Sequence, residues 1–93
     1  MREEISNKLN LPKEIILDIP KVIIVGKGEI TIENHKGILS FDNNVVRINS
    51  KLGPIKIEGS NFEILYIGSS TITVSGRFKT MFYEREDLWK LME

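Results

Sequence analysis

Between residues 21 and 84 the chain alternates apolar and polar residues in short runs, each closed by Gly, Asn or Ser. In EITIEN, VVRIN and TITVSG every second side chain is apolar. A period of two is typical of a strand with one buried and one solvated face. The predicted strands start at residues 21, 29, 37, 45, 54 and 62, at steps of eight or nine residues. The pattern therefore predicts a small all-β domain.

The alternation also predicts which side chains form the core. Two runs, KVIIVG and FEILYI, are apolar on both faces. The first is typical of a strand covered on two sides, and the second predicts a central strand or an interface. Along the other runs, eight apolar side chains are expected to share one dry interior: Ile30, Ile32, Val46, Ile48, Ile55, Ile57, Ile72 and Val74.

Hairpin-like spacing favours an antiparallel meander closed into a sandwich or roll of about seven or eight short strands. NHKG at 34–37 and GSN at 59–61 are interpreted as turns between strands. A β-solenoid-like stack is the alternative, because stacked repeats produce similar regularity. The whole chain, 1–93, is expected to be one domain. Its predicted parts are a helical lead-in (2–19), the β-meander (21–84) and a C-terminal helix (85–92).

Composition narrows the function classes. The chain of 93 residues has no Cys, and 13 basic residues balance 13 acidic ones. No thiolate can act as ligand or nucleophile, and the zero net charge argues against nucleic-acid binding driven by bulk electrostatics. Copies of a small chain with zero net charge repel each other only weakly, which is compatible with self-association.

No run approaches the ~18 apolar residues of a membrane span, and the charged N-terminus does not resemble a signal peptide. We therefore expect a soluble protein of the compartment in which it is made.

Residues able to carry chemistry are sparse and do not form a recognisable pattern. The single histidine, His35, falls in the NHKG turn and is expected to be solvated. Glu29, Glu33 and Glu58 are expected on polar sheet faces, without a cleft in which two carboxylates converge. Six aromatic residues on the strands are expected mainly to pack in the core: Phe41, Phe62, Tyr66, Phe78, Phe82 and Tyr83. We predict no catalytic residue, cofactor or metal site.

An interaction surface is the more promising candidate site. The segment EREDLWKLME has helical composition, with Leu88, Leu91 and Met92 on one stripe and Trp89 beside it. Trp89 can cap the protein's own core or anchor a partner, and both interpretations remain open. The candidate interface residues are Phe62, Leu65, Ile67, Leu88, Trp89 and Met92.

Three stretches resemble the YabP/YqfC family of sporulation proteins, and the similarity is closest to its YqfC branch. They are the lead-in LPKE…DIPKV, the turn IENHKGI and the hairpin pattern IN-x-x-x-G-x-I-x-I-x-G. The resemblance covers about residues 9 to 82. The family-pattern turn positions in this chain are Asn34, His35, Gly37, Gly53 and Gly59.

The resemblance implies a protein of endospore-forming Firmicutes, made in the mother cell and acting in spore coat or cortex assembly. It implies no enzymatic activity and no cofactor. The expected function is an assembly or interaction module in the mother-cell cytoplasm or at the forespore surface. The implied partners are proteins of spore assembly, a membrane-associated sporulation protein among them, together with copies of the chain itself and no nucleic acid. The alternatives are a small β-barrel that binds nucleic acid or a ligand, and a cell-wall-active enzyme.

Overall fold

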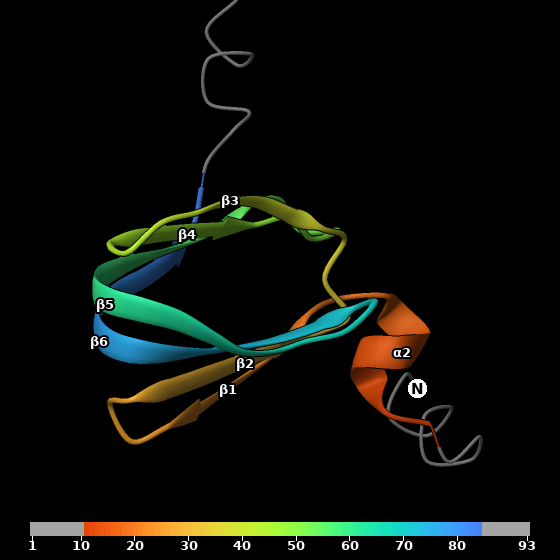
Figure 1. Ribbon diagram of the computed structural model, residues 1–93. Coiled ribbons are helices and arrows are strands. Elements are labelled where there is room, and N and C mark those ends of the chain that lie inside the picture. Colours follow the sequence, from red (N-terminus) through yellow and green to blue (C-terminus); the bar gives the residue numbers. More distant parts are fainter. Residues whose placement is uncertain (1–10, 85–93) are drawn as a thin grey trace, which may run out of the picture.

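The computed structural model describes residues 11–84, and within them the chain is mostly antiparallel β-sheet with little helix (Figure 1). The all-β prediction is therefore confirmed. The helix predicted for 85–92 and residues 2–10 of the helical lead-in lie outside the described residues. The described elements are α2 (Lys13–Leu17), β1 (Lys21–Val25), β2 (Glu29–Glu33), β3 (Ile38–Phe41), β4 (Val45–Ile48), β5 (Ile55–Ile67) and β6 (Thr71–Tyr83).

The helix α2 is short and has a clear local cause at each end. The carbonyl oxygen of Pro12 accepts hydrogen bonds from the backbone N–H groups of Ile15 and Ile16, at 3.1 and 3.3 Å. Proline suits the first turn of a helix because its missing N–H is not needed there. Asp18, directly after the helix, has a φ of 58°, and a left-handed residue commonly ends a helix. The buried Pro20 then leads into β1.

All six strands belong to one open sheet with the order β1-β2-β6-β5-β4-β3, and every pairing is antiparallel. Figure 1 shows this sheet bent, so that β3 and β4 lie above β1 and β2 while β5 and β6 join them at the left. The β1–β2 half comprises these two strands with 63–67 of β5 and 71–75 of β6. The β3–β4 half comprises the other two short strands with 55–60 of β5 and 77–83 of β6.

This topology differs from the sequence-based expectation in two ways. The closed sandwich or roll of seven or eight strands is not confirmed, because the described residues form six strands in one open sheet. A solenoid stacks successive repeats, whereas here β2 pairs with the distant β6. The solenoid alternative is therefore wrong.

The bend lies in β5 and β6, which are each 13 residues long. GSN at 59–61 is not the predicted turn, since it lies inside β5, where the register with β6 shifts. Such bulges bend strands and increase their twist. At Gly59 the two strands approach so closely that a Cβ would collide with the carbonyl oxygen of Arg77. Gly76, on the facing strand, has a φ of +151°. The bend therefore requires glycine at both positions, for close approach at Gly59 and for the backbone conformation at Gly76.

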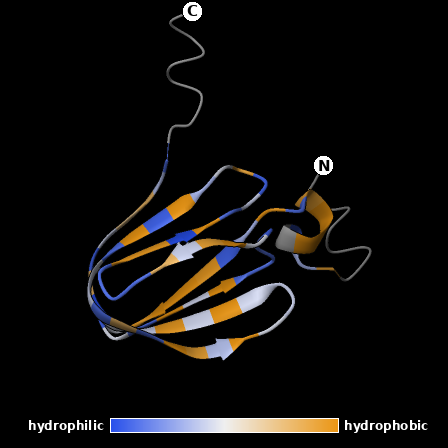
Figure 2. Cartoon of the chain, turned by 45° about the horizontal axis from the view of Figure 1, so that its top comes forward, coloured by the Kyte–Doolittle hydropathy of each residue, from blue (hydrophilic) through white to orange (hydrophobic). Residues whose placement is uncertain are grey.

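The core lies between the two halves of the sheet. All eight side chains predicted to share the interior are at most 2% exposed, which confirms that prediction. Phe62 is also buried in this core, at 2% exposure, and its ring stacks on that of Phe78 with centroids 5.4 Å apart. Figure 2 shows hydrophobic and hydrophilic positions alternating along the strands, as a single buried sheet face requires. Full burial of each large apolar side chain contributes about 1.5–3 kcal/mol.

The NHKG segment at 34–37 is a crossover between the halves and not the predicted hairpin turn. It joins β2 to β3, and these two strands do not pair with each other. The backbone N–H of His35 donates to the carbonyl oxygen of Ser70 at 3.1 Å, and that of Lys36 donates to Asn49 at 2.8 Å. Because Ser70 borders the β1–β2 half and Asn49 borders β4, these bonds fix the crossover to both halves.

Candidate interaction surface

The structure does not bring the three sequence-predicted carboxylates together. Glu29 and Glu33 lie at opposite ends of β2, four residues apart, or about 13 Å along a strand. Glu58 lies on β5 in the β3–β4 half, where it accepts a hydrogen bond from Thr80 Oγ1 at 2.8 Å. These carboxylates therefore do not form an acid–base pair.

His35 is buried, so the prediction of a solvated turn residue is wrong. Only 6% of the residue is exposed, because the crossover carries it across the end of the core. Its Nδ1 accepts a hydrogen bond from the backbone N–H of Gly37 at 2.9 Å, while its Nε2 is buried without a partner. Burial disfavours the charged ring and lowers the pKa of His35 below its ordinary value. The ring is therefore neutral, and the hydrogen bond that it accepts from Gly37 stabilises the crossover.

The other family-pattern positions have backbone roles. Asn34 adopts a φ of 61°, and its side-chain Nδ2 donates to Asp18 Oδ1 at 3.3 Å and to the carbonyl oxygen of Ile19 at 3.0 Å. Gly37 and Gly53 have φ values of 124° and 105°, which favour glycine. Gly59 lies at the strand bend and not in a turn. These residues hold the connections between strands in place.

Within residues 11–84, no three His, Cys, Asp or Glu side chains are grouped so that they could hold a metal ion. The part of the chain that the structure describes also has no helix long and apolar enough to cross a membrane. Among the surface features that remain are exposed apolar side chains at the free edges of the sheet.

The most prominent of these edges is formed by residues 63–67 of β5, which we call the β5 edge. On one side it pairs with β6 over residues 72–75. On its other side no described strand pairs with it, because the β4 pairing stops at Glu58. Four consecutive apolar side chains are exposed here: Ile64 (40%), Leu65 (56%), Tyr66 (57%) and Ile67 (55%).

Both faces of the β5 edge are apolar. Ile64 and Ile67 are paired with the buried Val74 and Ile72 and therefore lie on the inner face of the sheet. Their partial exposure arises because the open sheet has no further described strand beside them. The edge therefore has backbone N–H and C=O groups that pair with no described strand. Its exposed apolar side chains would be stabilised by burial.

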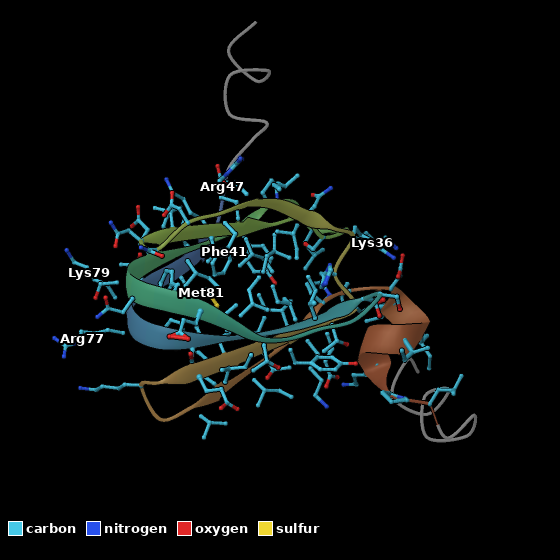
Figure 3. All side chains as sticks on the ribbon, in the orientation of Figure 1. Lys36, Phe41, Arg47, Arg77, Lys79 and Met81 are labelled. Carbon is cyan, nitrogen blue, oxygen red and sulfur yellow. The ribbon has the colours of Figure 1, made fainter. Side chains whose placement is uncertain are left out.

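The other free edges are less suited to strand addition. β3 has only four residues. Residues 77–83 of β6 carry Arg77 and Lys79, and Figure 3 shows both pointing outward while Met81 points between the halves. Short length and positive charge are common ways in which proteins protect edges from pairing. β1 forms the fourth edge and lines an apolar groove with β6. The β5 edge carries only one charge, on Glu63.

The structure separates the predicted interface residues into three groups. Leu65 and Ile67 are exposed on the β5 edge. Phe62 is buried in the core, which corrects its assignment to the interface: as the strand bends, its side chain turns inward. The remaining candidates, Leu88, Trp89 and Met92, lie outside the described residues.

The six aromatic residues expected mainly in the core are also divided. Phe41 and Phe78 pack against the core beside the buried Phe62. Tyr66, Phe82 and Tyr83 are between 41% and 57% exposed. Sequence alternation did not reveal this exposure, because it does not indicate where a sheet ends.

Comparison with known proteins agrees with the resemblance seen in the sequence. The model of the YabP family matches residues 18–88. The uncharacterized protein YqfC of Bacillus subtilis (strain 168) is 35% identical over 83 residues, which cover 89% of each chain. The match contains the crossover, the bend and the β5 edge. The chain belongs to the YabP family.

Proposed function

We propose that this protein is a non-catalytic assembly or interaction module of spore formation, acting in the mother cell during coat or cortex assembly. Its membership of the YabP family supports the link to sporulation, with which the sequence resemblance associates this family. The single observation that carries the interaction role is the β5 edge, where four apolar side chains and unpaired strand backbone are exposed together.

A strand added to the β5 edge would form backbone hydrogen bonds and cover its apolar side chains. A second copy of the chain fits this mode. In an antiparallel pair centred on residues 64–67 the two Glu63 side chains lie at opposite ends of the contact, while apolar side chains meet on both faces. Like charges are then not opposite each other, and such self-complementarity is what a symmetric dimer requires. An extended segment from another spore-assembly protein, such as a membrane-associated one, would use the same edge.

The test is the association state of a double variant, Leu65→Lys with Ile67→Lys. These side chains are 56% and 55% exposed, so the variant should keep its fold. Burying roughly half of two large apolar side chains contributes about 2 kcal/mol in each copy, so the symmetric dimer should lose about 4 kcal/mol, which corresponds to about a 1,000-fold weaker association. Sedimentation equilibrium over a wide concentration range measures this change directly.

Val25→Lys is the matched control, because Val25 is 60% exposed on the β1 edge and should leave association unchanged. A photo-crosslinker at position 65 or at position 25, introduced in sporulating cells, tests for other partners. The proposal fails if the wild-type chain is monomeric at all concentrations and position 65 crosslinks no more than position 25.

A further inference from the structure

A groove of about 180 Å³ lies between β1 and residues 78–81 of β6, and we call it the β1–β6 groove. Four apolar side chains line it: Ile24, Ile30, Phe78 and Met81. Ile30 is 2% exposed, while Phe78 and Met81 pack partly buried against the core. Figure 3 shows Met81 directed toward the space between the two halves of the sheet. The inner part of the groove is therefore continuous with the hydrophobic core.

The outer part of the groove is also apolar on its β1 side. Ile24 is paired with Ile30 and lies on the same inner face of the sheet, but Ile24 is 54% exposed. The difference arises because no described strand lies beyond β1. An apolar chain in the groove would therefore remove the surface of Ile24 from water without moving the sheet.

The charged residues in the lining of the groove are two lysines, Lys27 in the β1–β2 turn and Lys79 on β6. Both are exposed, and Figure 3 shows Lys79 directed outward. Within residues 11–84, neither lysine forms an ion pair. Glu29 is adjacent to Ile30 but lies on the opposite face of β2, because successive strand residues alternate between faces. The groove is therefore apolar inside and positively charged at its rim.

The size of the groove fits one short hydrocarbon chain. An engineered protein cavity of about 150 Å³ holds benzene, so by proportion a groove of about 180 Å³ holds about seven carbon atoms. A lipid with two long chains is too large for this volume. The chemistry that matches both the lining and the rim is a single hydrocarbon chain that ends in an anionic group.

We propose that the β1–β6 groove binds a free anionic amphiphile with one hydrocarbon chain, such as a medium-chain carboxylate. The chain lies against Ile24 and Met81, and the carboxylate pairs with Lys27 and Lys79 at the rim. A free molecule is favoured over membrane lipid because the zero net charge of the protein provides no general attraction to an anionic surface. The inference is independent of the proposed function, because β1 and the β5 edge are opposite outer strands of the β1–β2 half.

The test compares octanoate, octanol and octylammonium, which have the same chain length and differ in their head groups. Each is titrated into the full chain, and backbone amide shifts in NMR spectra locate the binding site. We expect octanoate to shift the amides of β1, the β1–β2 turn and residues 77–81. Two exposed ion pairs should make octanoate bind about fivefold tighter than octanol, with octylammonium weakest. Hexanoate, which is two methylene groups shorter, should bind about 15-fold more weakly than octanoate.

Two variants separate the role of the rim from that of the apolar lining. Lys27→Gln combined with Lys79→Gln should weaken octanoate binding about fivefold and leave octanol binding unchanged. Ile24→Glu places a carboxylate in the groove and should abolish octanoate binding. Val25→Glu is the matched control, because Val25 is 60% exposed and lies on the opposite face of β1 from Ile24. Circular dichroism confirms that all variants retain the sheet.

The proposal is overturned if octanoate shifts no amides around the groove, or if it binds no tighter than octylammonium. Unchanged octanoate affinity in the lysine double variant would also overturn it. Tighter binding of an acidic peptide of alternating valine and glutamate would assign the groove to a protein segment instead. Cosedimentation of the chain with phosphatidylglycerol vesicles would assign it to a membrane surface, and either result would overturn the proposal.

Discussion

The bend in β5 and β6 provides the most direct test of how this sheet folds over its core. Two glycines permit the bend, each for a different physical reason. At Gly59 a Cβ would collide with the carbonyl oxygen of Arg77 on the paired strand. At Gly76 the φ of +151° is itself unfavourable for an L-residue, and a Cβ would lie 2.5 Å from Phe62 Cδ1 and 3.0 Å from the carbonyl oxygen of Ser60. The perturbation is therefore replacement of each glycine by alanine.

The expected losses follow from these contacts. Gly76→Ala combines backbone strain of about 1–3 kcal/mol with overpacking against Phe62 of about 1–3 kcal/mol, and thus about 2–6 kcal/mol in the free energy of unfolding. Gly59→Ala has no φ penalty, but its collision is with backbone, which no side-chain rotation can relieve. We expect it to cost at least about 3 kcal/mol, since β5 and β6 must separate locally. A small domain has a total stability of about 5–15 kcal/mol, so either change removes a large part of it.

Two glycines of the β1–β2 turn serve as controls. A Cβ added at Gly28 would have no heavy atom within 4 Å, and the residue has no positive φ, so Gly28→Ala should change stability by less than about 1 kcal/mol. Gly26 has equally open surroundings but a φ of +57°, so Gly26→Ala should cost about 1–2 kcal/mol from strain alone. Urea unfolding followed by circular dichroism measures all four variants. If Gly59→Ala and Gly76→Ala cost no more than Gly28→Ala, the close approach of β5 and β6 at the bend is wrong.

Two further predictions concern buried side chains. Because burial lowers the pKa of His35 in the folded state, stability should be complete above the ordinary value of about 6.5 and fall as pH decreases from there toward the lowered folded-state pKa. His35→Asn keeps an acceptor for the N–H of Gly37 and should abolish this slope in urea titrations between pH 5 and 8, whereas an unchanged slope would exclude His35 as its source. Phe62→Ala should lower the free energy of unfolding by about 3–5 kcal/mol, as measured by urea denaturation. Weakened association with normal stability would instead place Phe62 at an interface.

The strands and most of the core could be predicted from the sequence because alternation is a local property. A side chain two residues along a strand returns to the same face whatever the strand pairs with. Ile30, Ile32 and the other residues of the alternating runs are therefore buried as expected. Phe62 departs from that rule because its strand bends immediately before it.

The strands that are apolar on both faces show where this local reasoning ends. KVIIV and FEILYI have the composition of covered strands, but β1 and residues 63–67 of β5 are edges of the open sheet. Composition indicates that both faces of a strand are apolar. It does not indicate whether another element of the fold packs against those faces. The candidate surface at Leu65 and Ile67 was therefore predictable as a place of apolar excess, and only the strand order makes it an exposed edge.

The sequence by itself determined an all-β chain, the starts of its first four strands to within a residue and the residues that fill its interior. The tertiary structure decided whether each glycine-containing segment turns or continues: GSN at 59–61 stays within β5, and NHKG at 34–37 crosses between the halves and buries His35. The physical reason is that a glycine permits a hairpin, a bulge and a crossover equally well. Which of them forms depends on backbone hydrogen bonds to segments far away in the chain, such as Ser70 and Asn49 for the crossover.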